Sequence, residues 1–203
     1  MRLLLQAFLL EDALLDGPVY GVHISPGTGL DDVGADAPAH HLVPLDLQDR
    51  SKWDRELIRR GFACLVRSTE MDAVAAARYH LEAAIASRHC SAETFEKTDW
   101  ISICLLYDRL MEIDPSPLIE LNRAVALSYR DGPEAAVPIV ERLLANGELP
   151  NRYAGVAVLA NLHMRAGSRE RARPFLDEAL KQARTSHERD LIARQIEHAV
   201  RRV

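Results

Sequence analysis

Three things are scarce in this 203-residue sequence: cysteine, aromatic side chains and net positive charge. The cysteines are Cys64, Cys90 and Cys104, an odd number whose spacing fits neither a metal site nor a disulfide pattern, so we expect reduced thiols and a cytoplasmic protein. Aromatic residues make up 5% of the chain, which together with abundant alanine favours closely packed helices. With 25 Lys and Arg against 30 Asp and Glu, the net charge of −5 argues against direct nucleic-acid binding.

Sequence motifs of common enzymes are absent as well. The chain has no Gly-rich phosphate loop, no G-x-S-x-G and no H-E-x-x-H. Cys90 follows His89, but neighbouring helical residues point about 100° apart, so the two cannot easily act as nucleophile and base. His23, His40 and His41 have no partners at ligand spacing. We therefore expect no catalytic residues, no metal and no cofactor.

The first 46 residues differ from the rest of the chain. Residues 1–15 contain the apolar run RLLLQAFLLEDALL, which is too short to span a bilayer and lacks a signal-peptide cleavage site, so it predicts an N-terminal helix. Residues 16–46 are rich in glycine and proline and predict a long irregular loop. Residues 47–203 show helical patterns and predict one helical domain, with no membrane contact.

The stretch 98–133 shows the helical pattern most clearly. Its first half carries one apolar stripe at helical spacing, formed by Trp100, Ile103, Cys104, Tyr107, Leu110 and Met111. Thr98 or Asp99 can cap this helix, and Asp114-Pro115 ends it, because proline cannot continue a helix.

A second helix follows at once. Ser116 can cap it, with Pro117 at the first helical position, and Asp131-Gly132-Pro133 breaks it. Helices joined by such tight turns are typical of a stacked antiparallel helical array.

Residues 132–144 resemble residues 168–180, at an offset of 36. Four pairs at this offset are identical: Glu134/Glu170, Ala136/Ala172, Pro138/Pro174 and Leu144/Leu180. A period of about 34 residues with two helices per unit is typical of tetratricopeptide (TPR) repeats, and generic packing of helical hairpins is the alternative. We predict an all-α fold of roughly eight or nine helices, an antiparallel helical-hairpin array of the TPR-like, right-handed solenoid type.

Two expectations concern where helices begin. Pro138 and Pro174 each lie several residues into a helix, where proline lacks the N–H donor that the helix needs. Their shared repeat position predicts a shared late helix start or a shared kink. A further helix is expected from Ser51, whose hydroxyl can cap it, with Trp53 on its buried face.

Polar and aromatic residues interrupt the apolar helices. The candidate partner-binding residues are Arg50, Trp53, Glu82, His89, Asp99, Trp100, Asn122 and Arg123. One interpretation is a structural network that ties successive helices, because buried polar groups must be hydrogen-bonded. The other is the polar floor of a concave groove that holds a partner segment. Trp100 allows a similar pair of interpretations: a core residue packed near His89 or Ile85, or a residue that lines the groove.

Several runs, taken together, resemble one protein family. They are LDLQDRSKWD (45–54), YHLEAAIASRHC (79–90), TDW…LYDRL (98–110), PSPLIELNRAVA (115–126) and DGP (131–133). In order and spacing they are similar to the C-terminal extension of a group of bacterial extracytoplasmic-function (ECF) RNA polymerase sigma factors. In that group a TPR-like domain follows the polymerase- and promoter-binding regions. The resemblance covers about residues 42–188, although Glu82 stands where the family pattern has Gln.

The resemblance implies a non-catalytic regulatory domain that modulates transcription initiation through contacts with the sigma-factor regions, RNA polymerase or another protein. The polymerase- and promoter-binding regions are absent from the chain, so we expect either an excised C-terminal part or a freestanding relative. The alternative function is a freestanding TPR-like adaptor that binds peptide segments of other proteins. An enzyme would need the loop 16–46 to close as a lid over a site containing His89 or Arg123.

Overall fold

The computed structural model describes residues 48–68, 74–183, 189, 192 and 193. In chain order the elements are the 3-10 helix η2 (Arg50–Lys52) and the helices α3 (Arg55–Ser68), α4 (Val74–Ser91), α5 (Trp100–Ile113), α6 (Pro117–Arg130), α7 (Pro133–Ala145), α8 (Arg152–Arg165) and α9 (Arg169–Gln182). The expected N-terminal helix (1–15) and irregular loop (16–46) lie outside the described residues.

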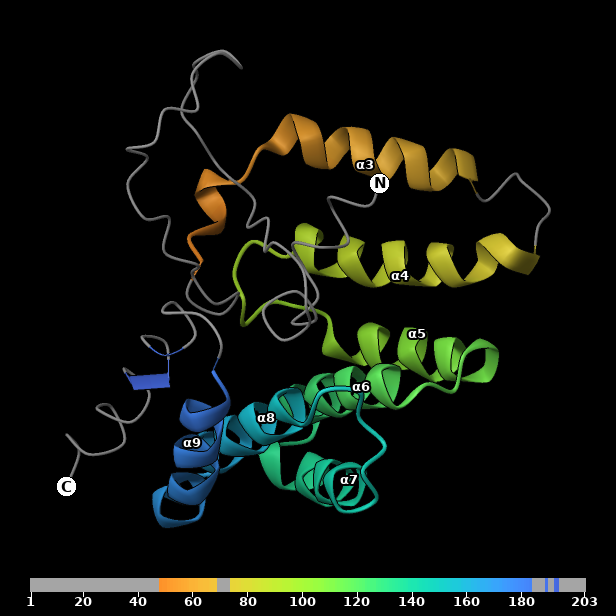
Figure 1. Cartoon of the computed structure of the whole chain (residues 1–203). Helices are drawn as coiled ribbons and strands as arrows, with labels where there is room; N and C mark the ends of the chain where they lie inside the picture. The colour runs from red at the N-terminus through yellow and green to blue at the C-terminus, as the bar shows by residue number, and fades with distance from the viewer. Residues whose placement is uncertain (1–47, 69–73, 184–188, 190–191, 194–203) are drawn as a thin grey trace, which may run out of the picture.

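The helices pack in the order in which they follow along the chain. Figure 1 shows α3, α4 and α5 one below the other, and each later helix packs against the one before it. Helix α6 also contacts α8, two helices further on. The described part contains seven α-helices and no strand, so the predicted all-α helical-hairpin array is confirmed. None of these helices is long and apolar enough to cross a membrane.

Side-chain caps explain where α5 and α6 begin, and a glycine turn precedes α7. The Asp99 carboxylate accepts a hydrogen bond from Ser102 N at 3.0 Å, and Ser116 Oγ accepts one from Ile119 N at 3.3 Å. These bonds satisfy amide donors that the first helical turn leaves open. Gly132 precedes α7 with a φ of +98°, a conformation that residues with a Cβ rarely adopt. The predicted starts of α5 and α6 and the break before α7 are confirmed.

Helices α7 and α9 repeat each other in structure. Helices α7 and α9 begin 36 residues apart, at Pro133 and Arg169. Residues equivalent at this offset are buried in the same cluster: Ala136 with Ala172, and Val140 with Leu176. The small alanines let each helix approach α8 closely, and the larger residues one turn later fill the core.

The chain returns from α7 to α8 through a closely packed turn. A Cβ on Gly155, in the first turn of α8, would lie 2.5 Å from Leu149 Cδ1 and 2.7 Å from Leu144 Cδ2. Leu144 and Leu149 are both buried. Only glycine allows this approach without displacing the two leucines.

Helices α7 and α9 run through Pro138 and Pro174, so the predicted late helix start is wrong, whereas the alternative, a shared kink, stays a prediction. Both prolines occupy the sixth position of their helix, and both are exposed. Neither has the N–H that would bond the carbonyl four residues earlier, on Glu134 or Glu170. The helices persist because their buried faces pack against α8, which outweighs one lost hydrogen bond in each.

The helix expected from Ser51 begins at Arg55 instead. Residues 50–52 form a single 3-10 turn, and Asp54 Oδ1 accepts a backbone N–H bond from the first turn of α3 at 2.9 Å. Trp53 therefore lies in the connection between the two elements and not on a helix face.

Candidate partner-binding site

Arg50 is a buried cation that joins η2 to the connection between α4 and α5. Its side chain is 3% exposed, and Nη1 donates to the carbonyl oxygens of His89 at 2.9 Å and Ala92 at 3.2 Å. Nη2 donates to Thr98 Oγ1 at 3.2 Å. The guanidinium thus occupies the carboxyl end of α4, where the helix dipole favours positive charge.

Aromatic rings surround the same guanidinium. Its carbon lies 5.0 Å from the ring centre of Trp53 and 5.7 Å from that of Phe95. Burial lowers the pKa of Arg50 from its usual value, but an arginine retains its charge at neutral pH. Carbonyl oxygens and aromatic faces therefore hold this charge, since no described carboxylate forms an ion pair with it.

Trp100 connects this region to the end of α6. Its ring stacks on Tyr129 with centres 4.4 Å apart and planes 17° apart. Edge contacts join Trp100 to His89 at 5.2 Å and to Phe95 at 5.4 Å. The side chain is half-buried. The expectation that Trp100 packs near His89 is confirmed, and Trp100 also contacts the following helix.

Arg165, at the end of α8, extends the contacts by one more helix. Its guanidinium carbon lies 3.7 Å from the ring centre of Tyr129. The same group donates to Ser128 Oγ at 2.7 Å and to the Ser128 carbonyl at 2.9 Å. We call the whole set the aromatic edge, and it consists of Arg50, Trp53, His89, Phe95, Trp100, Tyr129 and Arg165.

The buried His89 and its neighbour Cys90 are poorly suited to acid–base or nucleophilic chemistry at neutral pH. Burial, with a smaller effect of the Arg50 charge, lowers the pKa of His89 to about 4, so its imidazole is neutral. Burial raises the pKa of Cys90 to about 11, so its thiol stays protonated. In the described part of the chain, no three His, Cys, Asp or Glu side chains are grouped to hold a metal ion.

The structure brings only some of the predicted site residues together. Arg50, Trp53, His89 and Trp100 meet in the aromatic edge, and Asp99 lies beside it as the exposed cap of α5. The first interpretation, a network that ties successive helices, describes the contacts of these four residues within the chain. Their contact with a partner stays a prediction.

The other three predicted residues lie elsewhere in the array. Glu82 pairs with Arg78 at 2.9 Å, and Arg78 also reaches Asp114 at the end of α5. Arg123 pairs with Asp108 across α5 and α6 at 2.5 Å. Asn122 is buried in α6. The Arg78–Asp114 and Arg123–Asp108 pairs join neighbouring helices and do not form a common floor with the aromatic edge.

Sequence reasoning missed Phe95, Tyr129 and Arg165. Phe95 lies between two helices, where no periodic pattern marks it. Tyr129 could have been predicted from the sequence. In an antiparallel hairpin the start of one helix neighbours the end of the next, and Trp100 starts α5. Arg165 follows Tyr129 by 36 residues, the offset of the repeat, so equivalent positions of neighbouring units meet here.

Comparison with known proteins gives one relative of undetermined function. Over 158 residues the chain is 38% identical to an uncharacterized protein of Rhizobium meliloti (strain 1021). The match covers 77% of this chain and 36% of that protein, so the chain spans about a third of its relative's length. No protein-family model and no solved structure matches the chain.

Proposed function

We propose that this chain is a non-catalytic regulatory domain of an ECF-type RNA polymerase sigma factor. It acts in the cytoplasm by holding a sigma-factor region, or a surface of RNA polymerase, against the helical array. In this proposal the domain does not contact DNA itself, because the chain as a whole carries a net charge of −5.

The observation that supports this proposal most is that separate runs resembling the sigma-factor extension contact one another in the aromatic edge. Arg50 and Trp53 belong to LDLQDRSKWD, His89 to YHLEAAIASRHC, and Thr98 with Trp100 to TDW. Hydrogen bonds from Arg50 reach both of the other runs, at the His89 carbonyl and at Thr98 Oγ1. Three sequence runs that resemble the sigma-factor extension are therefore in direct contact in this fold.

The side chains of the aromatic edge suit protein recognition. Trp53, Phe95, Trp100 and Tyr129 are each half-buried, so every ring is held in place and still presents surface. Trp, Tyr and Arg are the residue types that dominate the energetics of protein–protein interfaces. A partner segment lying along this edge would contact the ends of α4, α6 and α8 at once.

The length of the Rhizobium relative is compatible with a domain that works within a longer polypeptide. The matched stretch is 36% of that protein, so most of its chain lies outside the part that resembles this one. In our proposal this chain likewise works beside polymerase- and promoter-binding regions, which another part of a longer polypeptide supplies.

A fusion experiment tests the proposal. The chain is joined to the two sigma regions of an ECF sigma factor from the group that it resembles, and transcription from the target promoter is compared with that of the sigma regions alone. We expect a clear change in transcription when the domain is removed, and a smaller change for Trp53→Ala. Ile101→Ala, at a 63% exposed site on α5, is the matched control.

Transcription that is the same with and without the domain would overturn the regulatory proposal. The adaptor function would then be favoured, in which the array binds segments of proteins unrelated to transcription.

A further inference from the structure

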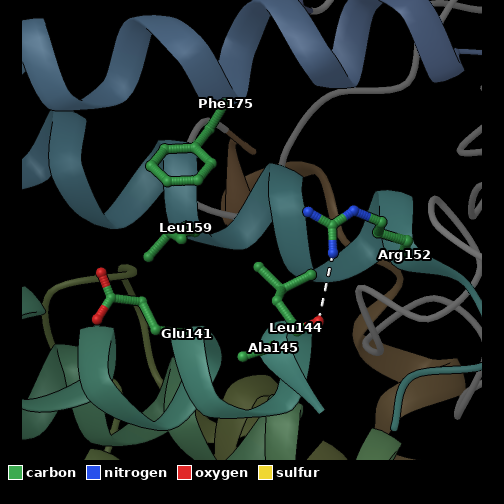
Figure 2. Close-up of a pocket in the computed structure, with 6 residues that line it drawn as sticks. All are labelled: Glu141, Leu144, Ala145, Arg152, Leu159 and Phe175. Atoms are coloured by element: carbon green, nitrogen blue, oxygen red, sulfur yellow. Dashed lines mark hydrogen bonds between the residues drawn. The ribbon is translucent and has the colours of Figure 1, made fainter. Parts of the chain in front are cut away.

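A small hollow lies between α7, α8 and α9, away from the aromatic edge. It measures about 230 Å³ and is lined by Glu141, Leu144, Ala145, Arg152, Leu159 and Phe175. Figure 2 shows Phe175 of α9 facing the α7 residues across Leu159 of α8. The hollow is smaller than typical ligand sites of about 300–1,000 Å³, so it suits one side chain better than a cofactor.

The inner surface of the hollow is apolar and firmly held. Leu159 is 1% exposed, Leu144 is buried, and both belong to the main core cluster. The ring of Phe175 stacks on buried His163 with centres 5.6 Å apart. An aliphatic side chain entering here would contact leucine and phenylalanine carbons that are already in place, at little cost in ordering.

The charges at the rim are unequal. Arg152 already has partners for its charge. Its Nε donates to the Glu178 carboxylate at 2.8 Å. Its Nη1 donates to the Leu144 carbonyl at 3.3 Å, the bond drawn in Figure 2. Glu141, by contrast, is exposed and forms no ion pair or hydrogen bond with the described residues.

Glu141 and Arg171 both act electrostatically on the imidazole of His163. The charge of Glu141 acts on His163, whose pKa is nevertheless lowered by burial, so that imidazole stays neutral at neutral pH. Arg171 also acts on His163 but does not line the hollow. The mouth therefore presents one exposed carboxylate, which forms no ion pair with the described residues, beside an apolar floor.

We propose that this hollow is a recognition pocket for an aliphatic side chain of a partner protein that is followed or preceded by lysine or arginine. The aliphatic group packs on Leu144, Leu159 and Phe175, and the neighbouring cation pairs with Glu141. This inference rests on the proposed function as a protein-interaction domain and adds a second contact, in the hollow between α7, α8 and α9.

Three capped heptapeptides test the pocket, with the central residues Lys-Leu-Lys, Glu-Leu-Glu and Lys-Ser-Lys between Gly-Ser ends. Binding to the full chain is followed through the methyl NMR signals of Leu144 and Leu159. We expect the Lys-Leu-Lys peptide to shift both signals with a Kd of roughly 1 mM, as suits a single anchor residue. The other two peptides should leave them nearly unchanged.

Two variants and their matched controls locate the binding. Ala145→Phe fills the hollow from its exposed rim and should weaken the Lys-Leu-Lys peptide at least about tenfold. Glu141→Gln should weaken it about threefold, the size of one exposed ion pair. Ala63→Phe on α3 and Glu112→Gln on α5 change exposed residues away from the hollow and should have no effect.

Several outcomes would overturn the pocket. They are equal shifts from Lys-Leu-Lys and Lys-Ser-Lys, which indicate charge attraction alone, no shift of either leucine, or no response to Ala145→Phe. Failure here is distinct from failure of the proposed function. If deletion of the domain still changes transcription while the peptides do not bind, the regulatory role stands and only the pocket is lost.

Discussion

Arg50 Nη1 lies 2.9 Å from the carbonyl oxygen of His89, a residue 39 positions later in the chain. This bond, with those to Ala92 and Thr98, fixes the segment before α3 against the end of α4. The planar guanidinium can satisfy three acceptors and lie between two rings at once, which a lysine ammonium cannot do.

Arg50→Lys should therefore destabilise the protein although it preserves the charge. We expect a loss of about 2 kcal/mol in the free energy of unfolding, from lost charged hydrogen bonds and ring contacts. Urea unfolding measures it. Lys52→Ala, two residues away at an exposed site, should change stability by no more than about 0.5 kcal/mol. Equal effects of the two substitutions would contradict the role assigned to Arg50.

Trp100→Ala should be costly in spite of the partial exposure of the ring. The substitution removes the stack on Tyr129 and the edge contacts with His89 and Phe95, and we expect a loss of about 3 kcal/mol, at the low end for a tryptophan truncation. Ile101→Ala, at the next residue, should be nearly neutral. A melting temperature of Trp100→Ala within a degree or two of wild type would rule out a structural role for this ring.

Stability should fall on mild acidification because of His89. Its folded-state pKa is about 4 against 6.5 when unperturbed, so between these values the unfolded chain binds more protons than the folded one. The contribution is complete above about pH 6.5 and decreases as the pH falls, by at most about 3 kcal/mol at pH 4. Asp99 does not act in this window, because hydrogen bonds from Ser102 lower its pKa below 3.8.

Urea unfolding at several pH values between 7.5 and 4.5 checks this dependence. His89→Gln should flatten the decline, although the variant starts from a lower stability. The pKa of His163 is lowered in the same direction as that of His89, so some decline should remain in His89→Gln. An identical slope in His89→Gln and wild type would contradict the assignment.

Pro138→Ala and Pro174→Ala should each stabilise the protein. Alanine restores the N–H that bonds the carbonyl of Glu134 or Glu170, and no packing is lost because both prolines are exposed. We expect a gain of about 1–2 kcal/mol each, after allowing for the greater freedom of the unfolded chain. Thermal melts measure it. Pro133→Ala, at the first position of α7, should give no gain, since proline suits that site.

The sequence predicted the features of the fold that depend on neighbouring residues. The caps at Asp99 and Ser116 and the glycine break at Gly132 follow from backbone chemistry within a few positions. The offset of 36 predicted a repeating helical unit, and α7 and α9 bury equivalent residues in the same core cluster. Ser51 was predicted to cap this helix, but Asp54 caps it instead. Both residue types can cap a helix, and the path of the chain decides which of them does so.

The candidate site was predictable only in part. Polarity on apolar helices identified Arg50 and His89, but the same rule selected Arg123, which pairs with Asp108 across α5 and α6. Which polar residues meet depends on how helices cross, and periodicity does not contain that information. The contact of Phe95 with Trp100 likewise depends on how the α4–α5 connection folds back.

The consecutive packing of the helices has a consequence for how the molecule opens. In a linear array the free energy is close to a sum of terms between neighbours, so local opening begins at the helices that their neighbours hold least. Helix α3 has no buried residue among those described, whereas α6 packs against α5, α7 and α8. Backbone amides of α3 should therefore exchange with deuterium well before those of α6, and the aromatic edge, by bridging α4, α5, α6 and α8, makes those helices open as one cooperative unit.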